Sequence, residues 1–184
     1  MVDYAISVIN NLVYFYMNIA LSGDQVQSLA GPNTKVLSYP QLKNVHDIRE
    51  LLPKSMILYQ TGNSGNTASG HWTSICCVDN EIYFFDSYGT FPDKEQNYIG
   101  SSYLQQSDQV RNKIQGLMKK SKLPLNYNEH RYQLMKPNIN TCGRHSAFYL
   151  RSGLSTDDYF SLMSYLKKIT KMPYDKLIVY LTDN

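Results

Sequence analysis

Three residues of this chain carry side chains that together could act as a nucleophile, a base and an orienting acid. The first, Cys142, lies in the stretch Asn-Thr-Cys-Gly-Arg-His directly before an apolar run, which predicts that it begins a helix. The free backbone N–H groups at a helix N-terminus favour a thiolate over a thiol. Cys142 is therefore a candidate nucleophile, although a lone cysteine is often just a small buried apolar residue.

The other two residues, His71 and Asp86, flank a predicted β-hairpin. Residues 72–78 and 81–85 read as strands, and Asp79-Asn80 between them suits a two-residue turn. Residues 62–70 read as a polar loop that brings His71 to the start of the first strand. The hairpin places His71 roughly opposite Asp86, with an offset that a bulge or a diagonal contact can absorb.

A histidine paired with a carboxylate is the base of a nucleophile, base and orienter triad. The carboxylate fixes the tautomer and leaves the second ring nitrogen to accept the proton of the thiol. Taken singly, His71 reads as a surface or hydrogen-bonded histidine and Asp86 as a turn former. The hairpin joins them and makes the catalytic interpretation the stronger one.

A zinc site is the main alternative use of these residue types. Cys142 and His145 have a zinc-like spacing, and Cys76, Cys77 or His130 could complete the set. Cys76 and Cys77 are neighbours in one predicted strand, so their side chains point to opposite faces and cannot both bind one ion. We expect both to pack, and we predict neither a metal nor another cofactor.

Length and composition describe an ordinary globular protein. The chain has 184 residues, 42% of them hydrophobic and 18% charged, which excludes a disordered chain. A chain of this size forms a single domain, here 1–184, that needs neither a metal nor a disulfide to fold. Its three cysteines do not form an even, spaced set, which indicates a reducing compartment.

The net charge of +3 does not select a partner. The lysines gather at 119–122 and 167–171, where we expect solvated helix faces, and contact with nucleic acid stays open. Residues 3–21 predict an amphipathic helix. Asp3 and three asparagines argue against a signal peptide or a membrane span in this segment.

The remaining pattern predicts an α+β fold with a central, mostly antiparallel sheet flanked by helices. Ser22 and Gln25 form a capping box for a helix that ends at Gly31. The other expected elements are strands at 56–59, 72–78, 81–85 and, at an edge, 125–134, and helices at 44–52, 103–120, 142–151, 155–170 and 174–181.

Three motifs in order carry a resemblance to a known family. Gly-His-Trp at 70–72, Phe-Asp-Ser-Tyr-Gly at 85–89 and Thr-Cys-Gly at 141–143 resemble the adenovirus maturation protease and its relatives, which include the SUMO-deconjugating proteases. The order His, Asp, Cys is opposite to that of papain. The resemblance covers roughly residues 20–152, and it leaves the N-terminal helical extension (1–21) and the C-terminal helices (153–184) without a counterpart.

The resemblance implies a papain-like core of the adenain type in which His71, Asp86 and Cys142 form the triad. It further implies that Trp72 narrows the substrate channel, where Gly70 and Gly143 let the substrate approach, and that a glutamine before the cysteine stabilises the oxyanion. The nearest glutamine is Gln133, nine residues ahead of Cys142 and farther than the family pattern. Asn138 or Asn140 could serve instead.

The expected function is that of a cysteine endopeptidase, a monomer that cleaves viral capsid or other structural precursors next to glycine in the virion and the host cytoplasm. Two alternatives use the same thiolate: removal of a ubiquitin-like modifier, and acyl transfer. Adenovirus-type relatives are stimulated by a peptide and by DNA, but no residue of this chain indicates either.

Overall fold

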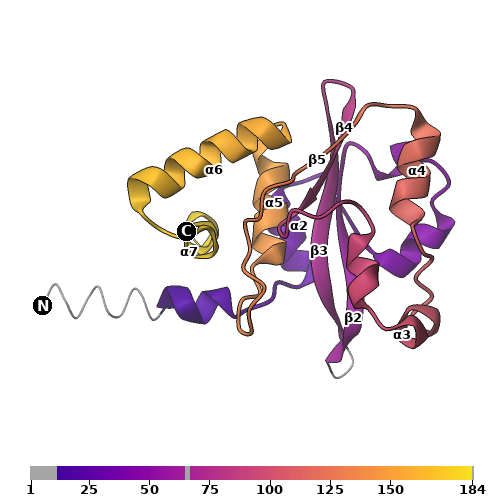
Figure 1. Ribbon diagram of the computed structural model, residues 1–184, viewed down its shortest axis with the longest axis horizontal. Coiled ribbons are helices and arrows are strands. Elements are labelled where there is room, and N and C mark those ends of the chain that lie inside the picture. Colours follow the sequence, from indigo (N-terminus) through magenta and orange to yellow (C-terminus); the bar gives the residue numbers. More distant parts are fainter. Residues whose placement is uncertain (1–11, 65–66, 184) are drawn as a thin grey trace, which may run out of the picture.

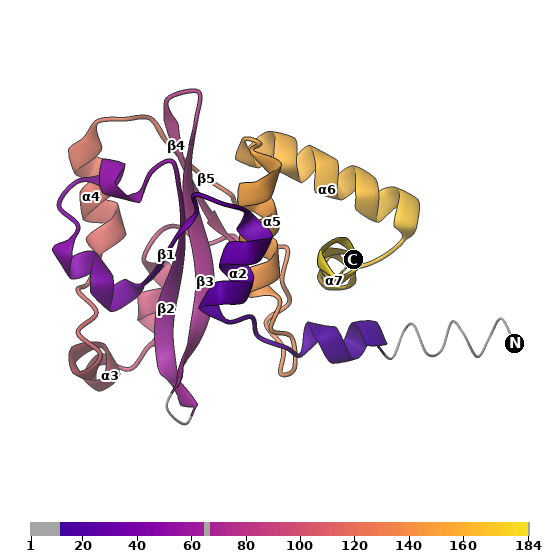
Figure 2. The same ribbon diagram turned by 180° about the vertical axis from the view of Figure 1, so that it is seen from behind.

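The computed structural model describes residues 12–64 and 67–183 and shows an α+β fold built on one five-stranded mixed sheet. Figure 1 shows this sheet between two groups of helices, and Figure 2 shows the same arrangement from behind. The strands follow the order β1-β2-β3-β4-β5 across the sheet. Their bounds are β1 Lys35–Ser38, β2 Lys54–Ser64, β3 Thr67–Val78, β4 Glu81–Asp86 and β5 Leu125–Tyr127.

The pairing of the strands is only partly antiparallel. β3 pairs antiparallel with both β2 and β4, as the sequence predicts, whereas the outer strands β1 and β5 join their neighbours in parallel. The predicted antiparallel pairing therefore holds for the three central strands, and the two edge strands depart from it. The short edge strands are placed by tertiary contacts rather than by a local turn, so no hairpin signal marks them.

The polar stretch at 62–70 belongs to strands β2 and β3 and is not the predicted loop. The two strands pair as far as Ser64 and Thr67, after a register shift between Gln60 and Gly62. They extend beyond the other strands at the lower end of the sheet in Figure 1. Ladder hydrogen bonds come from the backbone, so a polar sequence can continue a strand. His71 consequently lies inside β3 rather than at its start.

The turn between β3 and β4 confirms the predicted hairpin and shows how its two-residue offset is absorbed. Asp79 and Asn80 both have left-handed backbone angles, with φ of 49° and 64°, as a two-residue turn requires. The strand residue opposite Asp86 is Thr73, two positions beyond His71. Because His71 and Thr73 lie on the same face of β3, His71 and Asp86 meet diagonally.

One face of the sheet is covered by short helices. These are η1 (Tyr39–Asn44), η2 (Ile48–Leu51), α3 (Ser101–Gln106) and α4 (Lys113–Ser121), with η3 (Lys94–Tyr98) beside them. The single helix predicted over 103–120 is wrong, because Asp108 and Asn112 adopt left-handed angles that interrupt it. A buried carboxylate at Asp93 ties this layer together by accepting hydrogen bonds from the hydroxyl groups of Tyr39 and Tyr59 at 2.7 and 2.9 Å.

The other face carries the helices that matter for the candidate site. They are α2 (Gly23–Ala30), α5 (Cys142–Ser152), α6 (Thr156–Thr170) and α7 (Tyr174–Thr182), all close to their predicted bounds. The capping box of Ser22 and Gln25 is present. Tyr159 of α6 and Leu177 of α7 are fully buried in the same apolar core as Ala147 of α5, so the C-terminal helices pack on α5.

The N-terminal helix predicted over 3–21 lies partly outside the described residues. Residues 12–17 are helical, and the helix ends before Ile19. The strand predicted over 125–134 is also shorter, because the chain leaves β5 at Asn128 and runs as a loop to Cys142. Among the described residues, no helix has the length and apolar character needed to cross a membrane.

Candidate active site

Cys142 is the first residue of α5, as the sequence predicts. Its side chain lines a cleft of about 940 Å³ that runs between the N-terminal segment, α2 and the hairpin of β2 and β3. Cys142 is 6% exposed, and the cleft is where it can be reached from solvent. The cleft also contains Gly70 and Trp72, two residues predicted to contact substrate.

His71 lies between an acid and the thiol. Its Nε2 is 2.7 Å from the Asp86 Oδ1, and both side chains are buried. An ionised carboxylate can only accept a hydrogen bond, so Nε2–H is the donor and Nδ1 is left for another partner. Cys142 also raises the pKa of His71, so its thiol lies close to the imidazole. The three predicted catalytic residues are therefore adjacent, in the order acid, imidazole, thiol.

The electrostatics of this group stabilise the charged histidine. Burial by itself lowers the pKa of His71, but the charge and hydrogen bond of Asp86, together with Cys142, outweigh it and hold that pKa well above its ordinary value. Burial likewise raises the pKa of Asp86, and the His71 charge with three hydrogen bonds brings that pKa below its usual range. The pair is thus arranged as carboxylate and imidazolium.

Asp86 is held in place by neighbours that sequence reasoning did not identify. The Thr90 hydroxyl and the Tyr88 backbone N–H donate to its carboxylate. The side-chain amide of Asn128 makes two hydrogen bonds to the backbone of Asp86. It donates to the Asp86 carbonyl at 2.7 Å and accepts from the Asp86 N–H at 2.8 Å. The position of the carboxylate is therefore fixed before any substrate binds.

Tyr88 covers the other side of the imidazole. Its ring stacks on His71 with 4.4 Å between ring centroids and 9° between planes. This contact could have been predicted from the hairpin register. Thr73 pairs with Asp86, so the residue two positions beyond Asp86, which lies on the same side of the strand, falls opposite His71. The stacked ring excludes water from one face of the base.

Gln133 is buried in the loop that leads to Cys142. Its Oε1 accepts from the Ser87 hydroxyl at 2.8 Å, and its Nε2 donates to the Ile139 carbonyl at 2.9 Å. The side chain thus connects the residue after Asp86 with the segment just before the thiol. One amide hydrogen on Nε2 makes the bond to Ile139, and an amide nitrogen carries a second hydrogen.

The two asparagines considered as alternatives to Gln133 lie in different surroundings. Asn140 lines the cleft, but its Nδ2 faces the backbone and side-chain oxygens of Asn18 at 2.7 and 3.2 Å. Asn138 is exposed and has a left-handed backbone. Asn140 therefore connects the N-terminal segment to the loop before Cys142.

The aromatic and glycine residues shape the cleft by close packing. The Trp72 indole N–H donates to the Leu21 carbonyl at 3.0 Å, which fixes the ring against the N-terminal segment. A Cβ on Gly143 would lie 3.1 Å from the Trp72 ring, and one on Gly70 would lie 1.9 Å from the Tyr59 carbonyl oxygen. Both glycines are needed for these approaches within the protein itself.

Comparison with known proteins gives one informative likeness. No model of a known protein family matches the chain. The chain is similar to a virophage protein. It is 29% identical over 178 residues to the uncharacterized protein V9 of Sputnik virophage, a match that covers 91% of this chain and 97% of that protein. This likeness supports a viral source for the chain.

Glu95 is a further acid beside the pair that no sequence signal identified. It is 6% exposed, and its Oε1 is buried without a hydrogen-bond partner. One oxygen of Glu95 lies within 4.8 Å of a ring nitrogen of His71 and a carboxylate oxygen of Asp86. Among the residues described, these three side chains form the group that could hold a metal ion. Burial raises the pKa of Glu95, and the charge of His71 opposes that effect.

The cysteines and histidine of the zinc alternative lie apart from that group. Cys76 packs in the core, where its thiol donates to the Tyr149 hydroxyl at 3.7 Å, and Cys77 is half-buried. His145 faces Asp175, with 3.6 Å between its Nε2 and the Asp175 Oδ1. The spacing of Cys142 and His145 therefore does not bring their side chains into one ligand set within the described structure.

Asp175 of α7 supports the loop that carries the nucleophile. Its carboxylate accepts hydrogen bonds from the Thr141 hydroxyl and from the Leu134 backbone N–H. Asp175 and Thr141 are both buried. The C-terminal helix, which has no counterpart in the family pattern, thus holds the residue directly before Cys142.

Proposed function

We propose that this chain is a cysteine endopeptidase with a papain-like core of the adenain type. The observation that carries the proposal is the position of His71, which contacts the Asp86 carboxylate through Nε2 and lies close enough to the Cys142 thiol for that thiol to raise its pKa. The helix N-terminus beneath the thiol and the adjoining cleft supply the two other requirements, stabilisation of negative charge and room for a peptide.

The chemistry follows from these contacts. His71 takes the proton of Cys142, and the thiolate sulfur forms a bond to the carbonyl carbon of the scissile peptide. The carbonyl oxygen becomes an oxyanion, stabilised by the Cys142 backbone N–H and the second amide hydrogen of Gln133. The carbon–nitrogen bond then breaks as His71 donates its proton to the leaving amine.

Water completes the cycle. His71 accepts a proton from a water molecule, whose oxygen attacks the thioester carbon. The carbon–sulfur bond then breaks to release the acid, and the thiolate takes the proton back from His71. Asp86 holds the imidazole in one tautomer throughout and stabilises its charged form. Tyr88 shields the ring, which keeps the ion pair in a medium of low polarity.

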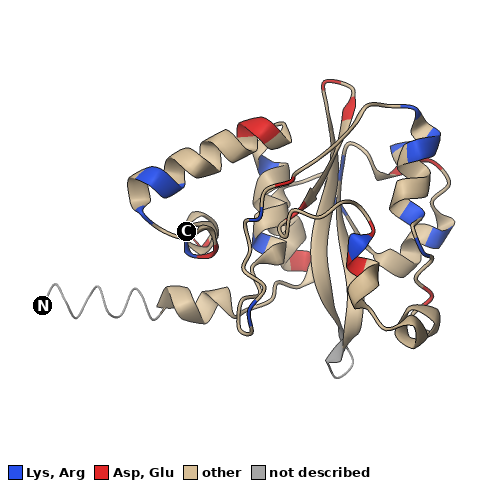
Figure 3. Cartoon of the chain, in the orientation of Figure 1, with Lys and Arg blue, Asp and Glu red and all other residues tan. Residues whose placement is uncertain are grey.

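The substrates we propose are capsid or other structural precursor proteins, cleaved next to glycine in the virion and the host cytoplasm. The likeness to a virophage protein supports a viral substrate. Trp72 is fixed against Leu21 at the cleft, which supports a narrow channel that small residues pass best. Figure 3 shows basic residues in separate groups on α4, α5 and α6, so nucleic acid is not part of this proposal.

A cleavage assay tests the proposal. Wild-type protein and Cys142→Ala are incubated separately with the virus's structural precursors and with a ubiquitin-like conjugate, and the products are identified by mass spectrometry. We expect the wild type alone to cleave the precursors at a glycine. Cleavage of only the conjugate would make the protein a deconjugating enzyme, acyl transfer to an added amine would make it a transferase, and cleavage by purified Cys142→Ala would overturn the mechanism.

A further inference from the structure

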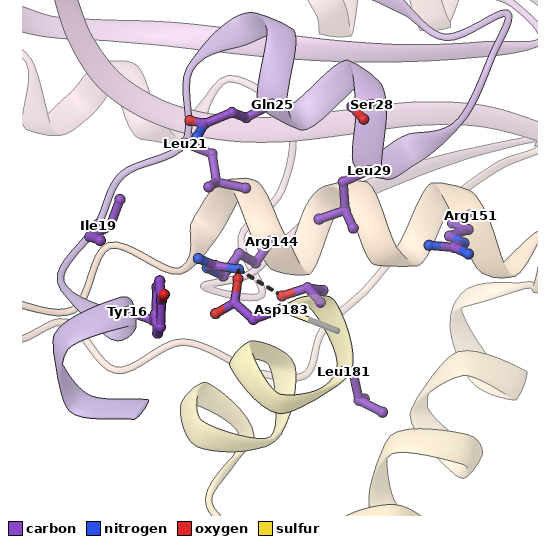
Figure 4. A pocket seen from close by; sticks show the side chains of 11 residues that line it. Tyr16, Ile19, Leu21, Gln25, Ser28, Leu29, Arg144, Arg151, Leu181 and Asp183 are labelled. Atoms are coloured by element: carbon purple, nitrogen blue, oxygen red, sulfur yellow. Dashed lines mark hydrogen bonds and ion pairs between the residues drawn. The ribbon is translucent and has the colours of Figure 1, made fainter. Parts of the chain in front are cut away.

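A second concave site adjoins the cleft that contains Cys142 and shares Leu21 and Gln25 with it. It is a groove of about 460 Å³ that the helices α2, α5 and α7 form together with the N-terminal segment. We call it the arginine groove, because Arg144 and Arg151 of α5 both line it (Figure 4). The other side chains that line it are those of Tyr16, Ile19, Leu21, Gln25, Ser28, Leu29, Leu181, Thr182 and Asp183.

Arg144 has a hydrogen-bonding edge that the protein does not use. It is 3% exposed, and its Nη1 donates to Asp183 Oδ1 at 2.6 Å and to Thr182 Oγ1 at 2.9 Å. Its Nε is buried without any hydrogen-bond partner. A buried donor without a partner is costly, and the edge formed by Nε and Nη2 is the one that binds a carboxylate with two parallel hydrogen bonds.

The charge of the groove is suited to an acidic ligand. Two arginines face one acid, Asp183, which leaves a net positive charge in the groove. Arg151 is exposed and free to follow a ligand, whereas the Arg144 guanidinium is fixed, with Tyr16 6.0 Å away and Asp183 beside it. Figure 4 shows the two arginines at separate points along α5, with Leu29 between them on the facing helix.

The spacing of the arginines specifies the ligand further. They are seven residues apart on one helix, which corresponds to about 10.5 Å along its axis. An extended peptide in the polyproline II conformation covers a similar length, about 9 Å, in three residues, and its residues i and i+3 lie on the same face. Leu21, Leu29 and Leu181 supply apolar contacts between the two charges. The matching ligand is an extended segment with acidic residues at positions i and i+3 and aliphatic residues between them.

We propose that the arginine groove is an exosite that binds such an acidic, aliphatic segment of the substrate outside the cleaved bond. Leu21 and Gln25 line both this groove and the catalytic cleft, so one peptide can occupy both. The claim that this segment belongs to the substrate rests on the proposed protease function. The claim that the groove binds such a segment is independent of that function.

The binding test uses catalytically inactive protein. A fluorescein-labelled peptide Gly-Asp-Leu-Leu-Glu-Gly is titrated with Cys142→Ala, and fluorescence anisotropy gives Kd. In this Cys142→Ala protein, the further substitution Arg151→Gln should weaken binding about tenfold or more. The same effect is expected for Arg144→Lys, which keeps the positive charge but loses the two parallel N–H donors of the guanidinium. Arg111→Gln, which removes the same charge on the opposite side of the sheet, should leave Kd unchanged. Equal binding of Gly-Asn-Leu-Leu-Gln-Gly, or equal Kd for the Arg151 and Arg111 variants, would overturn the site.

A kinetic test separates the exosite from the protease. Joined to a cleavable precursor peptide, the acidic segment should lower KM for wild-type protein and leave kcat unchanged. The decrease in KM should be absent in Arg151→Gln. Binding of the segment without a change in KM would contradict the substrate exosite, whereas failure of all cleavage with binding intact would contradict the protease function alone.

Discussion

At the scale of single residues, Asp86 determines how firmly His71 holds its proton. The carboxylate touches Nε2 inside the protein, where its charge is poorly screened, and it outweighs the burial of the imidazole. The free energy of unfolding should depend on pH for the same reason. The raised pKa of His71 contributes stability below its ordinary value of 6.5, and the lowered pKa of Asp86 contributes it above 3.8. The contribution of the pair is therefore fully present between these two values.

Asp86→Asn tests this coupling through the pH dependence of activity. The variant keeps a hydrogen-bond acceptor and loses the negative charge, so the pKa of His71 falls and the imidazolium is lost at lower pH. We expect the alkaline limb of kcat/KM to move down by about one to three pH units. A pH–rate profile of both proteins measures the shift, and an unmoved alkaline limb would show that Asp86 does not set the charge of the base.

Gln133→Glu tests the oxyanion assignment, because it keeps the acceptor for the Ser87 hydroxyl and removes the Nε2 donor. We expect kcat to fall about 10²- to 10³-fold with little change in KM. Asn140→Ala, which removes the other amide near the thiol, is the matched comparison and should cost less than about tenfold. The reverse order of effects, measured by steady-state kinetics, would assign the oxyanion to Asn140.

At the scale of secondary-structure elements, α7 holds the loop before Cys142 through one acid, Asp175. Asp175→Ala leaves the buried Thr141 hydroxyl and the partly buried Leu134 N–H without their acceptor. We expect the free energy of unfolding to fall by about 2–4 kcal/mol, measured by urea denaturation. Asp157→Ala, an exposed acid in the first turn of α6, should cost less than about 1 kcal/mol. Similar losses for the two variants would mean that α7 does not support the loop.

The elements that sequence predicted well are those whose signals are local. Helix α2 has its capping box, and the hairpin turn at Asp79-Asn80 has the residue types that accept left-handed angles. Strand β1 and the extension of β3 through Gly70 were missed, because both depend on pairing with β2 rather than on residue pattern. The proximity of His71, Asp86 and Cys142 was predictable from hairpin and helix positions, whereas Glu95 approaches His71 and Asp86 from a separate segment with no periodic signal.

At the scale of the whole molecule, two apolar cores share one sheet. Ile75 and Phe84 face the core under α4, while Cys76 and Phe85, their neighbours in the same strands, face the core under α5. Neither core can lose its helices without exposing the sheet that supports the other. The molecule should therefore unfold as one cooperative unit.

This expectation can be checked with the single tryptophan. Trp72 belongs to the core under α5, so its fluorescence reports that side, whereas far-ultraviolet circular dichroism reports all helices and strands. We expect the two urea transitions to coincide. Separate midpoints would show that the two layers unfold independently.

The central claim is that His71 activates Cys142, and the rate of Cys142 alkylation tests it most directly because no substrate is needed. Wild-type protein and His71→Ala are treated with iodoacetamide at pH 6, and peptide mass spectrometry follows Cys142, with the half-buried Cys77 as internal reference. We predict that Cys142 reacts at least about tenfold faster in the wild type, because the imidazolium stabilises the thiolate. Equal rates in the two proteins would contradict the catalytic pair.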